Sequence, residues 1–293
     1  MIFQKYVRTD LAAESAVIEN KQDLNGIEVE EQTLDFGKAL NIKIISDEGK
    51  ELLGKDIGTY VTISFDNILN MSNDTTNKIS HYLSETIKRL TNSTPPPSTV
   101  LVAGLGNRYI TPDAIGPLSV KGITVTRHIE ALDKQLFTSL KMQNLSAISP
   151  GVIGQTGIET FEIIKGAVNN VNPDLLIVID ALASKSVDRL ASTIQVCDTG
   201  ISPGSGIGNN NKEINKNSVG IPVIAIGVPT MVSSSTLVCD ALEKSGINDI
   251  NDDLVKVLEN GRSFFVTLNE SDVVVNLLAD IISNAINLAF TIE

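Results

Sequence analysis

The chain of 293 residues lacks tryptophan and contains 4% aromatic residues, two cysteines and two histidines. So few aromatic rings disfavour base-stacking surfaces and sugar-binding platforms. The cysteines, Cys197 and Cys239, form neither a CxxC pair nor a disulfide framework. We therefore expect both thiols to be reduced and the protein to be cytoplasmic.

The chain also lacks an excess of positive charge, because its formal net charge is -12. This balance argues against non-specific binding to nucleic acid or to an anionic membrane. No uninterrupted apolar run reaches the roughly 18 residues that cross a bilayer, and residues 1–10 do not look like a secretory signal. We expect neither direct nucleic-acid partners nor membrane partners.

What the chain does contain is an alternation of apolar strands with helix-length segments, from residue 99 to about residue 232. This alternation predicts an α/β fold, with a mostly parallel, doubly wound sheet flanked by helices. The expected strands are 99–104, 145–149, 175–180, 192–197 and 222–227, and the expected helices are 113–122, 127–133, 157–170 and 184–190.

The rest of the chain is predicted to surround this core. Residues 1–30 are interpreted as an N-terminal arm, and a small β-containing region follows. In that region we expect strands at 42–45 and 60–65 joined by a turn, a helix at 75–92 and a stiff linker at 92–98. A helical tail is expected at 237–244 and 273–290. The predicted organisation is residues 11–98 packed on an α/β catalytic core of residues 99–293.

Two acidic residues follow apolar runs in this core, and they are the main candidates for chemistry. Asp113 comes shortly after the run at 100–107, and Asp180 closes the run at 175–179. In parallel sheets the ligand crevice lies at the carboxyl ends of the strands, so both side chains should reach it. A buried Asp180 requires a partner. Two converging carboxylates can share a proton, one acting as acid and the other as base toward a water, without a cofactor.

Other interpretations of these residues remain open. Asp113 follows a proline and can be a first-turn charge that the helix dipole favours. A metal site would need a third ligand beside the two aspartates, and Glu159 or Asp198 is available for it. The chain has two histidines, His81 and His128, and the helix-like surroundings of His128 favour a surface or core-edge role over metal binding.

Nucleophilic and phosphate-binding sites find less support. The loop at 104–107 lacks the Gly-Lys-Ser/Thr of a phosphate loop and is interpreted as a tight turn. Ser205 lies outside a Gly-x-Ser-x-Gly elbow, and Ser233 has no nearby histidine, so loop and cap roles are expected.

Several short blocks, in order, resemble the germination protease (spore protease) family of endospore-forming bacteria. The resemblance covers residues 5–20 and 98–232 best. The matching blocks include residues 7–14 (VRTDLAAE), 104–107 (GLGN), 111–117 (TPDAIGP), 126–128, 150–152, 156–160, 171–174, 179–183 (IDALA), 200–206 and 220–230 (GIPVIAIGVPT).

This resemblance implies an aspartic-type endopeptidase that degrades small acid-soluble spore proteins during germination, in the spore core. It implies that Asp113 and Asp180 are the catalytic pair, that no metal or other cofactor takes part, and that the enzyme is a homotetramer. The family makes zymogens that remove their own N-terminal segment, and it cuts after an acidic residue, before a large apolar residue followed by alanine. Asp10 and Leu11, with alanine next, have this pattern, so residues 1–10 are the expected propeptide.

A looser resemblance to hydrogenase-maturation endopeptidases implies a core fold like theirs. Those enzymes use a later histidine to sense a metal, and this chain has no histidine after His128. Two alternatives stay open: a metal-assisted peptidase that uses Asp113, Asp180 and Glu159, and a catalytically inert homologue that binds spore proteins.

Overall fold

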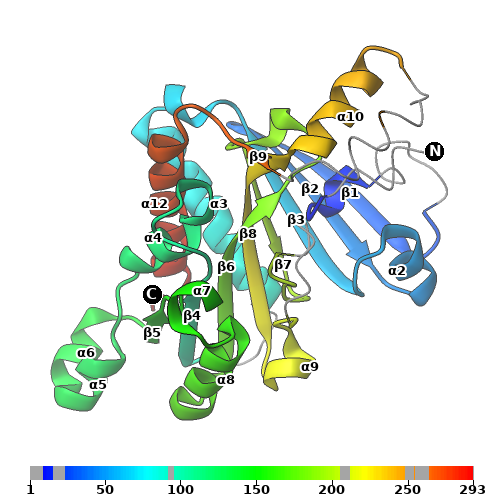
Figure 1. Cartoon of the computed structure of the whole chain (residues 1–293). Helices are drawn as coiled ribbons and strands as arrows, with labels where there is room; N and C mark the ends of the chain where they lie inside the picture. The colour runs from blue at the N-terminus through cyan, green and yellow to red at the C-terminus, as the bar shows by residue number, and fades with distance from the viewer. Residues whose placement is uncertain are drawn as a thin grey trace.

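The computed structural model describes residues 9–15, 24–91, 96–204, 212–247, 254 and 264–292. These residues form one mixed, nine-stranded sheet with helices on both faces (Figure 1). The strands follow the order β1-β2-β3-β7-β8-β6-β4-β5, and β9 pairs with β8. The predicted α/β class is confirmed.

The parallel part of the sheet contains the apolar runs of the central module. It consists of β5 (Asn144–Ile148), β4 (Thr99–Gly104), β6 (Leu175–Ala183) and β8 (Val223–Ser233), all paired in parallel. Strands β4, β6 and β8 are almost entirely buried and mostly apolar, which explains why the sequence identified them, whereas β5 at the edge is only partly buried. The carboxyl ends of these four strands therefore meet at one edge of the sheet.

The other part of the sheet is antiparallel, so parallel pairing covers less of the sheet than expected. It consists of β1 (Ile27–Leu34), β2 (Gly37–Ile44), β3 (Gly58–Phe65) and β7 (Thr193–Cys197), with the short β9 (Phe265–Val266) beside β8. A two-residue loop joins β1 to β2, and such a loop can join only antiparallel neighbours. Since β3 pairs with β7, the N-terminal strands extend the same sheet.

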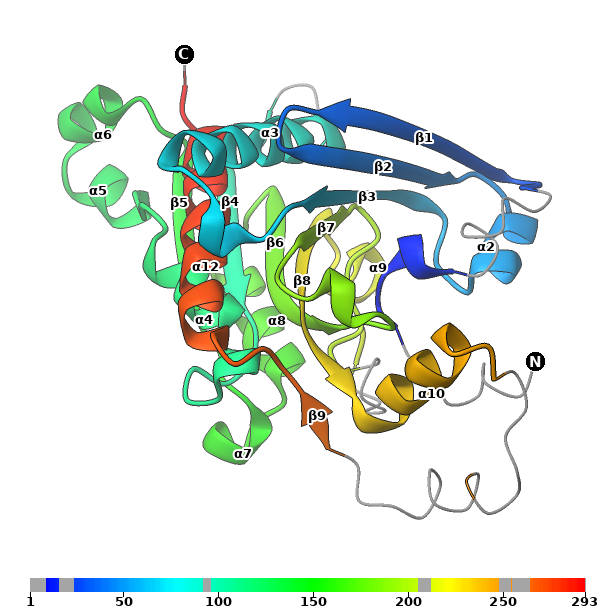
Figure 2. The ribbon, with the colours of Figure 1, turned by 90° about the horizontal axis from the view of Figure 1, so that it is seen from above.

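Helices α3 (Asn73–Thr91), α4 (Ile115–Lys121) and α12 (Ser271–Ala289) cover one face of the parallel strands (Figure 2). By length and composition alone α12 qualifies as a membrane-spanning helix, but 56% of its most apolar stretch is buried inside the protein. It packs against α3 and α4, as a core helix does. The opposite face carries α8 (Thr160–Val171) and α9 (Lys216–Val219).

Three sequence-based expectations about local structure are wrong. The end of the supposed N-terminal arm, from Ile27, is part of β1, an edge strand whose seven other residues face water or are only partly covered. The turn expected between β2 and β3 contains α2 (Asp47–Leu53). The helix expected at 184–190 is only the 3-10 turn η5 (Val187–Arg189), because residues 184–186 bind Glu14 instead.

The remaining elements are short. The helix expected at 113–122 is divided into the 3-10 turn η4 (Thr111–Asp113) and α4, and the linker at 92–98 lies partly outside the described residues. The other helices are α5 (Arg127–Leu132), α6 (Lys134–Leu140), α7 (Ile153–Thr156), α10 (Ser234–Lys244), η2 (Ala12–Glu14) and η3 (Ile68–Asn70).

Candidate active site

The loop after β4 holds Asp113 at the carboxyl edge of the sheet. Gly106 has a φ of +103°, and a Cβ atom there would lie 2.1 Å from the carbonyl oxygen of Asp113. Because the loop passes so close, the N–H of Asn107 donates to Asp113 Oδ2 at 2.7 Å. The hydroxyl of Thr230, on β8, donates to the carbonyl of Pro112 at 2.6 Å. The glycine-rich turn predicted from sequence therefore positions a carboxylate.

Asp180 lies within β6, near its carboxyl end. Alternation along the strand places its side chain on the face opposite Ile179, and its residue is only 6% exposed. The N–H of Ala181 donates to Asp180 Oδ1 at 2.9 Å. Its partner in the sheet is Gly227 on β8, and the side chain of Leu182 occupies the space that a Cβ atom at Gly227 would need.

Asp180 lies close enough to Asp113 for the charge of Asp113 to act on it. Burial raises the pKa of Asp180 well above its ordinary value, and the negative charge of Asp113 raises it further. Burial also raises the pKa of Asp113, although the hydrogen bond from Asn107 opposes this shift. Among the described residues no lysine or arginine forms an ion pair with either carboxylate. The structure thus places both predicted residues in one acidic, weakly hydrated site.

A third carboxylate, Asp10, lies beside this pair. Its N–H donates to the carbonyl of Ala183 at 3.0 Å, and its Oδ2 accepts from the N–H of Ala183 at 2.9 Å. The charge of Asp10 is a further cause of the raised pKa of Asp180. The sequence singled out Asp10 only as a cleavage position. The structure shows that it also belongs to the surroundings of Asp180.

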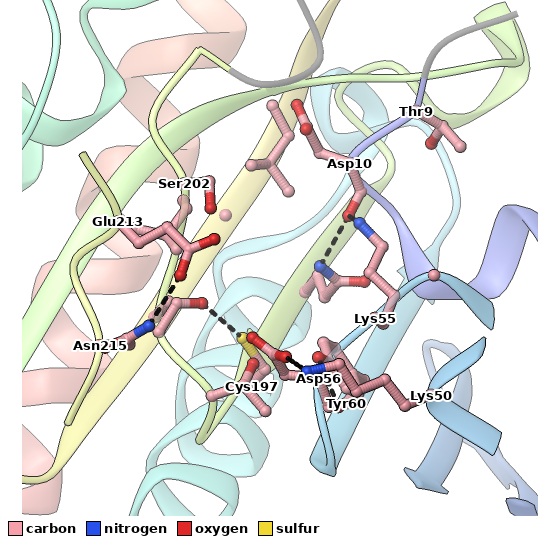
Figure 3. Close-up of a pocket in the computed structure, with 18 of the residues that line it drawn as sticks. Thr9, Asp10, Lys50, Lys55, Asp56, Tyr60, Cys197, Ser202, Glu213 and Asn215 are labelled. Atoms are coloured by element: carbon pink, nitrogen blue, oxygen red, sulfur yellow. Dashed lines mark hydrogen bonds and ion pairs between the residues drawn. The ribbon is translucent and has the colours of Figure 1, made fainter. Parts of the chain in front are cut away.

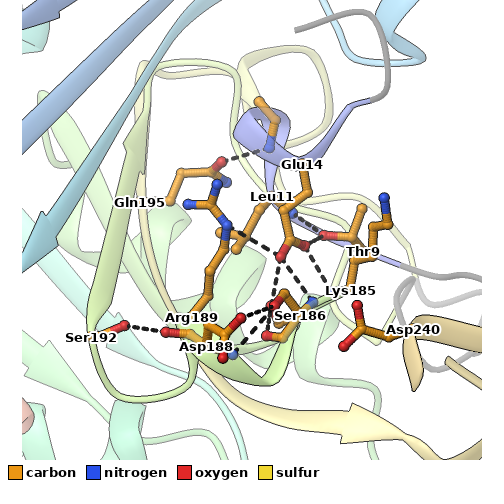
Figure 4. Close-up of polar contacts among 12 residues, drawn as sticks. Thr9, Leu11, Glu14, Lys185, Ser186, Asp188, Arg189, Ser192, Gln195 and Asp240 are labelled. Atoms are coloured by element: carbon orange, nitrogen blue, oxygen red, sulfur yellow. Dashed lines mark hydrogen bonds and ion pairs between the residues drawn. The ribbon is translucent and has the colours of Figure 1, made fainter. Parts of the chain in front are cut away.

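The N-terminal segment (residues 9–15) is anchored by Glu14, which is 3% exposed (Figure 4). Leu11 and Ala12 are each 1% exposed, so the segment is part of the protein's interior. The partners of the Glu14 carboxylate are Thr9 Oγ1, Ser184 Oγ at 2.8 Å, Lys185 N at 2.7 Å, Ser186 N at 3.1 Å and Arg189 Nε at 3.3 Å. Sequence reasoning missed Glu14 and Arg189, since only tertiary contact joins them.

An open cavity of about 770 Å³ lies next to the N-terminal segment (Figure 3). Its walls include Asp10, Lys55 and Leu182, but neither Asp113 nor Asp180. Gly227, the sheet partner of Asp180, also lines it. The cavity therefore borders the β8 residue that pairs with Asp180, without including either carboxylate of the pair.

The other candidate residues lie elsewhere. Glu159 is exposed at the start of α8, and His81 and His128 are exposed. Within the part of the chain that the structure describes, no three histidine, cysteine, aspartate or glutamate side chains form a group suited to a metal. The side chain of Ser233 caps α10, and the loop of Ser205 lies outside the described residues.

Both cysteines are buried and unpaired. The thiol of Cys197 donates to the carbonyl of Gly200 at 3.4 Å. Asp198 accepts a hydrogen bond from the N–H of Thr59, so this carboxylate fixes the end of β7 against β3. We therefore assign structural roles to Cys197 and Asp198.

Comparison with known proteins identifies the family. The sequence model of the germination protease family matches residues 7–245. A germination protease of Clostridium perfringens is 42% identical over 270 residues, covering 91% of this chain and 81% of that protein. One of Caldanaerobacter subterraneus subsp. tengcongensis is 39% identical over 312 aligned positions, covering 99% of this chain and 95% of that protein.

Solved structures offer a weaker likeness. The [NiFe] hydrogenase maturation protease HycI of Thermococcus kodakarensis covers 67% of this chain and 98% of its own, at 16% identity and a TM-score of 0.34. The endopeptidase HybD of E. coli covers 59% of this chain and 99% of its own, at 16% identity and a TM-score of 0.26.

The sequence matches define the class of protein: the chain is an endopeptidase, a hydrolase of peptide bonds. It belongs to the germination protease family, and its role is that of a protease in spore germination.

Proposed function

We propose that this chain is a self-activating endopeptidase in which Asp113 and Asp180 activate a water that attacks the scissile carbonyl. The observation that carries the proposal is the buried Asp180, whose charge no cation among the described residues balances and whose pKa the neighbouring Asp113 raises. A buried carboxyl of this kind keeps a proton that it can donate. Small acid-soluble spore proteins in the spore core are the proposed substrates, and a homotetramer is the proposed assembly.

The two aspartates have different roles in the proposed reaction. Asp180 is the more buried, and two neighbouring negative charges disfavour its ionisation, so it holds the shared proton. Asp113 is partly exposed and accepts a hydrogen bond from Asn107, which favours its charged form. Asp113 is then the base that takes a proton from water, and Asp180 is the acid that protonates the leaving nitrogen.

The pH dependence of cleavage follows from these assignments. The active form needs Asp180 protonated and Asp113 ionised, so the rate falls as pH rises through the raised pKa of Asp180. The rate also falls in acid, where Asp113 becomes protonated. Because burial raises the pKa of Asp113, this fall in rate occurs at a pH above the ordinary carboxyl pKa of about 3.9. Single-turnover rates measured across pH should give a bell-shaped curve. A rate that keeps rising into alkaline solution would contradict these roles.

The N-terminal segment supports self-cleavage between Asp10 and Leu11. Asp10 is held against Ala183 at the end of β6, and its charge reaches Asp180. The next two side chains, Leu11 and Ala12, are buried, so an acidic, a large apolar and a small residue occupy consecutive sites. This is the order of residues that the resemblance implies for substrates.

Incubation of the purified chain at mildly acidic pH tests the proposal directly. We expect N-terminal sequencing to show a new end at Leu11, and the processed enzyme to cut a peptide containing Glu–Ile–Ala after the glutamate. The matched control is the same peptide with Gln–Ile–Ala, which should be cut much more slowly. An intact chain and an uncut peptide would favour the inert binding protein. Loss of cleavage in a chelator would favour the metal site of Asp113, Asp180 and Glu159.

A further inference from the structure

The carbonyl oxygen of Asp10 accepts two side-chain hydrogen bonds. Lys55 Nζ lies 3.0 Å from this oxygen (Figure 3). Gln195 Nε2 lies 3.4 Å from the same oxygen. The carbonyl belongs to the Asp10–Leu11 peptide bond. A cation and an amide NH₂ group therefore converge on the oxygen of the bond at which self-cleavage is proposed.

The orientation of Gln195 is determined by a second contact. The N–H of Ala12 donates to Gln195 Oε1 at 2.8 Å, so the NH₂ group of the same amide must face the Asp10 carbonyl. Gln195 is 6% exposed within β7, where neighbouring strands limit its movement. Gln195 therefore forms one hydrogen bond with the carbonyl of Asp10 and one with the N–H of Ala12, on either side of Leu11.

Lys55 reaches the carbonyl because α2 ends just before it. Gly54 adopts a φ of +62° and its N–H donates to the carbonyl of Lys50, which closes the helix. The left-handed residue turns the chain, so Lys55 leaves the helix axis and extends its ammonium to the N-terminal segment. The helix α2, which the sequence analysis did not predict, thus positions the Lys55 ammonium beside the Asp10 carbonyl.

Docking of the segment alone does not require these contacts. The carboxylate of Glu14 already holds one end of the segment, and the backbone N–H and the side-chain carboxylate of Asp10 each form a hydrogen bond with the backbone of Ala183. An ammonium aimed at a carbonyl oxygen interacts more strongly as negative charge develops there. Its position favours the transition state of peptide hydrolysis over the resting amide.

We propose that Lys55 is a catalytic residue of self-cleavage, which stabilises, together with Gln195, the oxyanion that forms on the Asp10 carbonyl oxygen. This inference rests on the proposed function. Water adds its oxygen to the carbonyl carbon while Asp113 takes one proton, and the C=O π electrons move to the oxygen that Lys55 and Gln195 hold. The C=O bond then re-forms, the C–N bond breaks, and Asp180 gives its proton to the Leu11 nitrogen. The aspartate pair ends with one proton, as it began.

The variant Lys55→Met tests this role, because methionine keeps most of the side-chain length and removes the charge. Removal of one donor from an oxyanion site slows the chemical step by about 10²–10³-fold, and we expect that loss in single-turnover self-cleavage of the full chain. Lys55→Arg, which keeps a cationic donor, should restore part of the rate. Lys43→Met, which removes a surface charge that pairs with Glu28 on β1, should cleave like the wild type.

Hydrogen exchange at the Ala12 amide, measured in the same samples, distinguishes a slower chemical step from weaker docking of the N-terminal segment. The inference requires Lys55→Met to protect this amide as well as the wild type does while cleaving far more slowly. Cleavage of Lys55→Met at the wild-type rate would overturn it, and so would a parallel loss of cleavage and protection, which would make Lys55 a docking residue. A wild-type chain that cuts peptides but never its own Asp10–Leu11 bond would instead overturn the proposed self-activation, and with it this inference.

Discussion

Asp180→Asn is expected to abolish both self-cleavage and peptide cleavage while the protein stays folded. The asparagine side chain fits the same buried site but has no proton to give to the leaving nitrogen. General acid–base groups contribute about 10²–10⁴-fold each, so the rate should fall by about 10²–10⁴-fold. Asp113→Asn should cause a similar loss, because it removes the base. Single-turnover cleavage followed by mass spectrometry measures both effects.

The stability of Asp180→Asn gives an independent check. The folded pKa of Asp180 is raised above that of the unfolded chain, mainly by burial. Its contribution to stability is therefore complete below the unfolded pKa of about 3.9 and is lost as pH rises through the folded pKa. At neutral pH the asparagine variant should have a higher Tm than the wild type, and the difference should shrink in acid.

Asp198→Asn is the control, since Asp198 is an aspartate that follows β7, at the edge of the sheet away from the candidate site. Its hydrogen bond from the N–H of Thr59 can be kept by the asparagine oxygen. It should cleave at the wild-type rate. Full proteolysis by folded Asp180→Asn or Asp113→Asn would refute the catalytic pair.

Glu14→Ala is expected to release the N-terminal segment and thereby prevent self-cleavage. The substitution leaves Arg189 without its buried partner and removes the acceptor for two backbone N–H groups, of Lys185 and Ser186. Loss of one partner of a buried ion pair costs 3–5 kcal/mol, and since Arg189 is partly exposed we expect about 3 kcal/mol. The docked population, and with it the self-cleavage rate, should fall by up to about 100-fold.

Hydrogen exchange of the Ala12 amide, together with the cleavage rate, measures this effect. Glu14→Ala should lose both protection and cleavage, which distinguishes an anchor from Lys55, where only cleavage is expected to change. Glu28→Ala, which removes one member of a surface ion pair on β1, is the control and should change neither. Unchanged protection and cleavage in Glu14→Ala would mean that the other contacts suffice to hold the segment.

The core strands and the two aspartates could be predicted because local patterns encode them. A strand buried on both faces is apolar throughout, so β4, β6 and β8 stand out, and an aspartate at the end of such a strand is conspicuous. The edge strand β1 left no such signal, because six of its eight residues are exposed and one is partly covered, so its sequence is mostly polar. The helix α2 was equally hidden, since two glycines in and after it resemble a turn.

By itself, the sequence determined the α/β class and the family, and it singled out Asp113 and Asp180 as candidates for the catalytic pair. Only the tertiary structure decided what surrounds the Asp10–Leu11 bond. Lys55 contacts Asp10 across 45 residues and Gln195 across 185, while Glu14 meets Ser184 across 170. Such contacts leave no periodicity in a single chain, because a polar residue on a turn or a strand looks the same whether or not a distant segment folds against it.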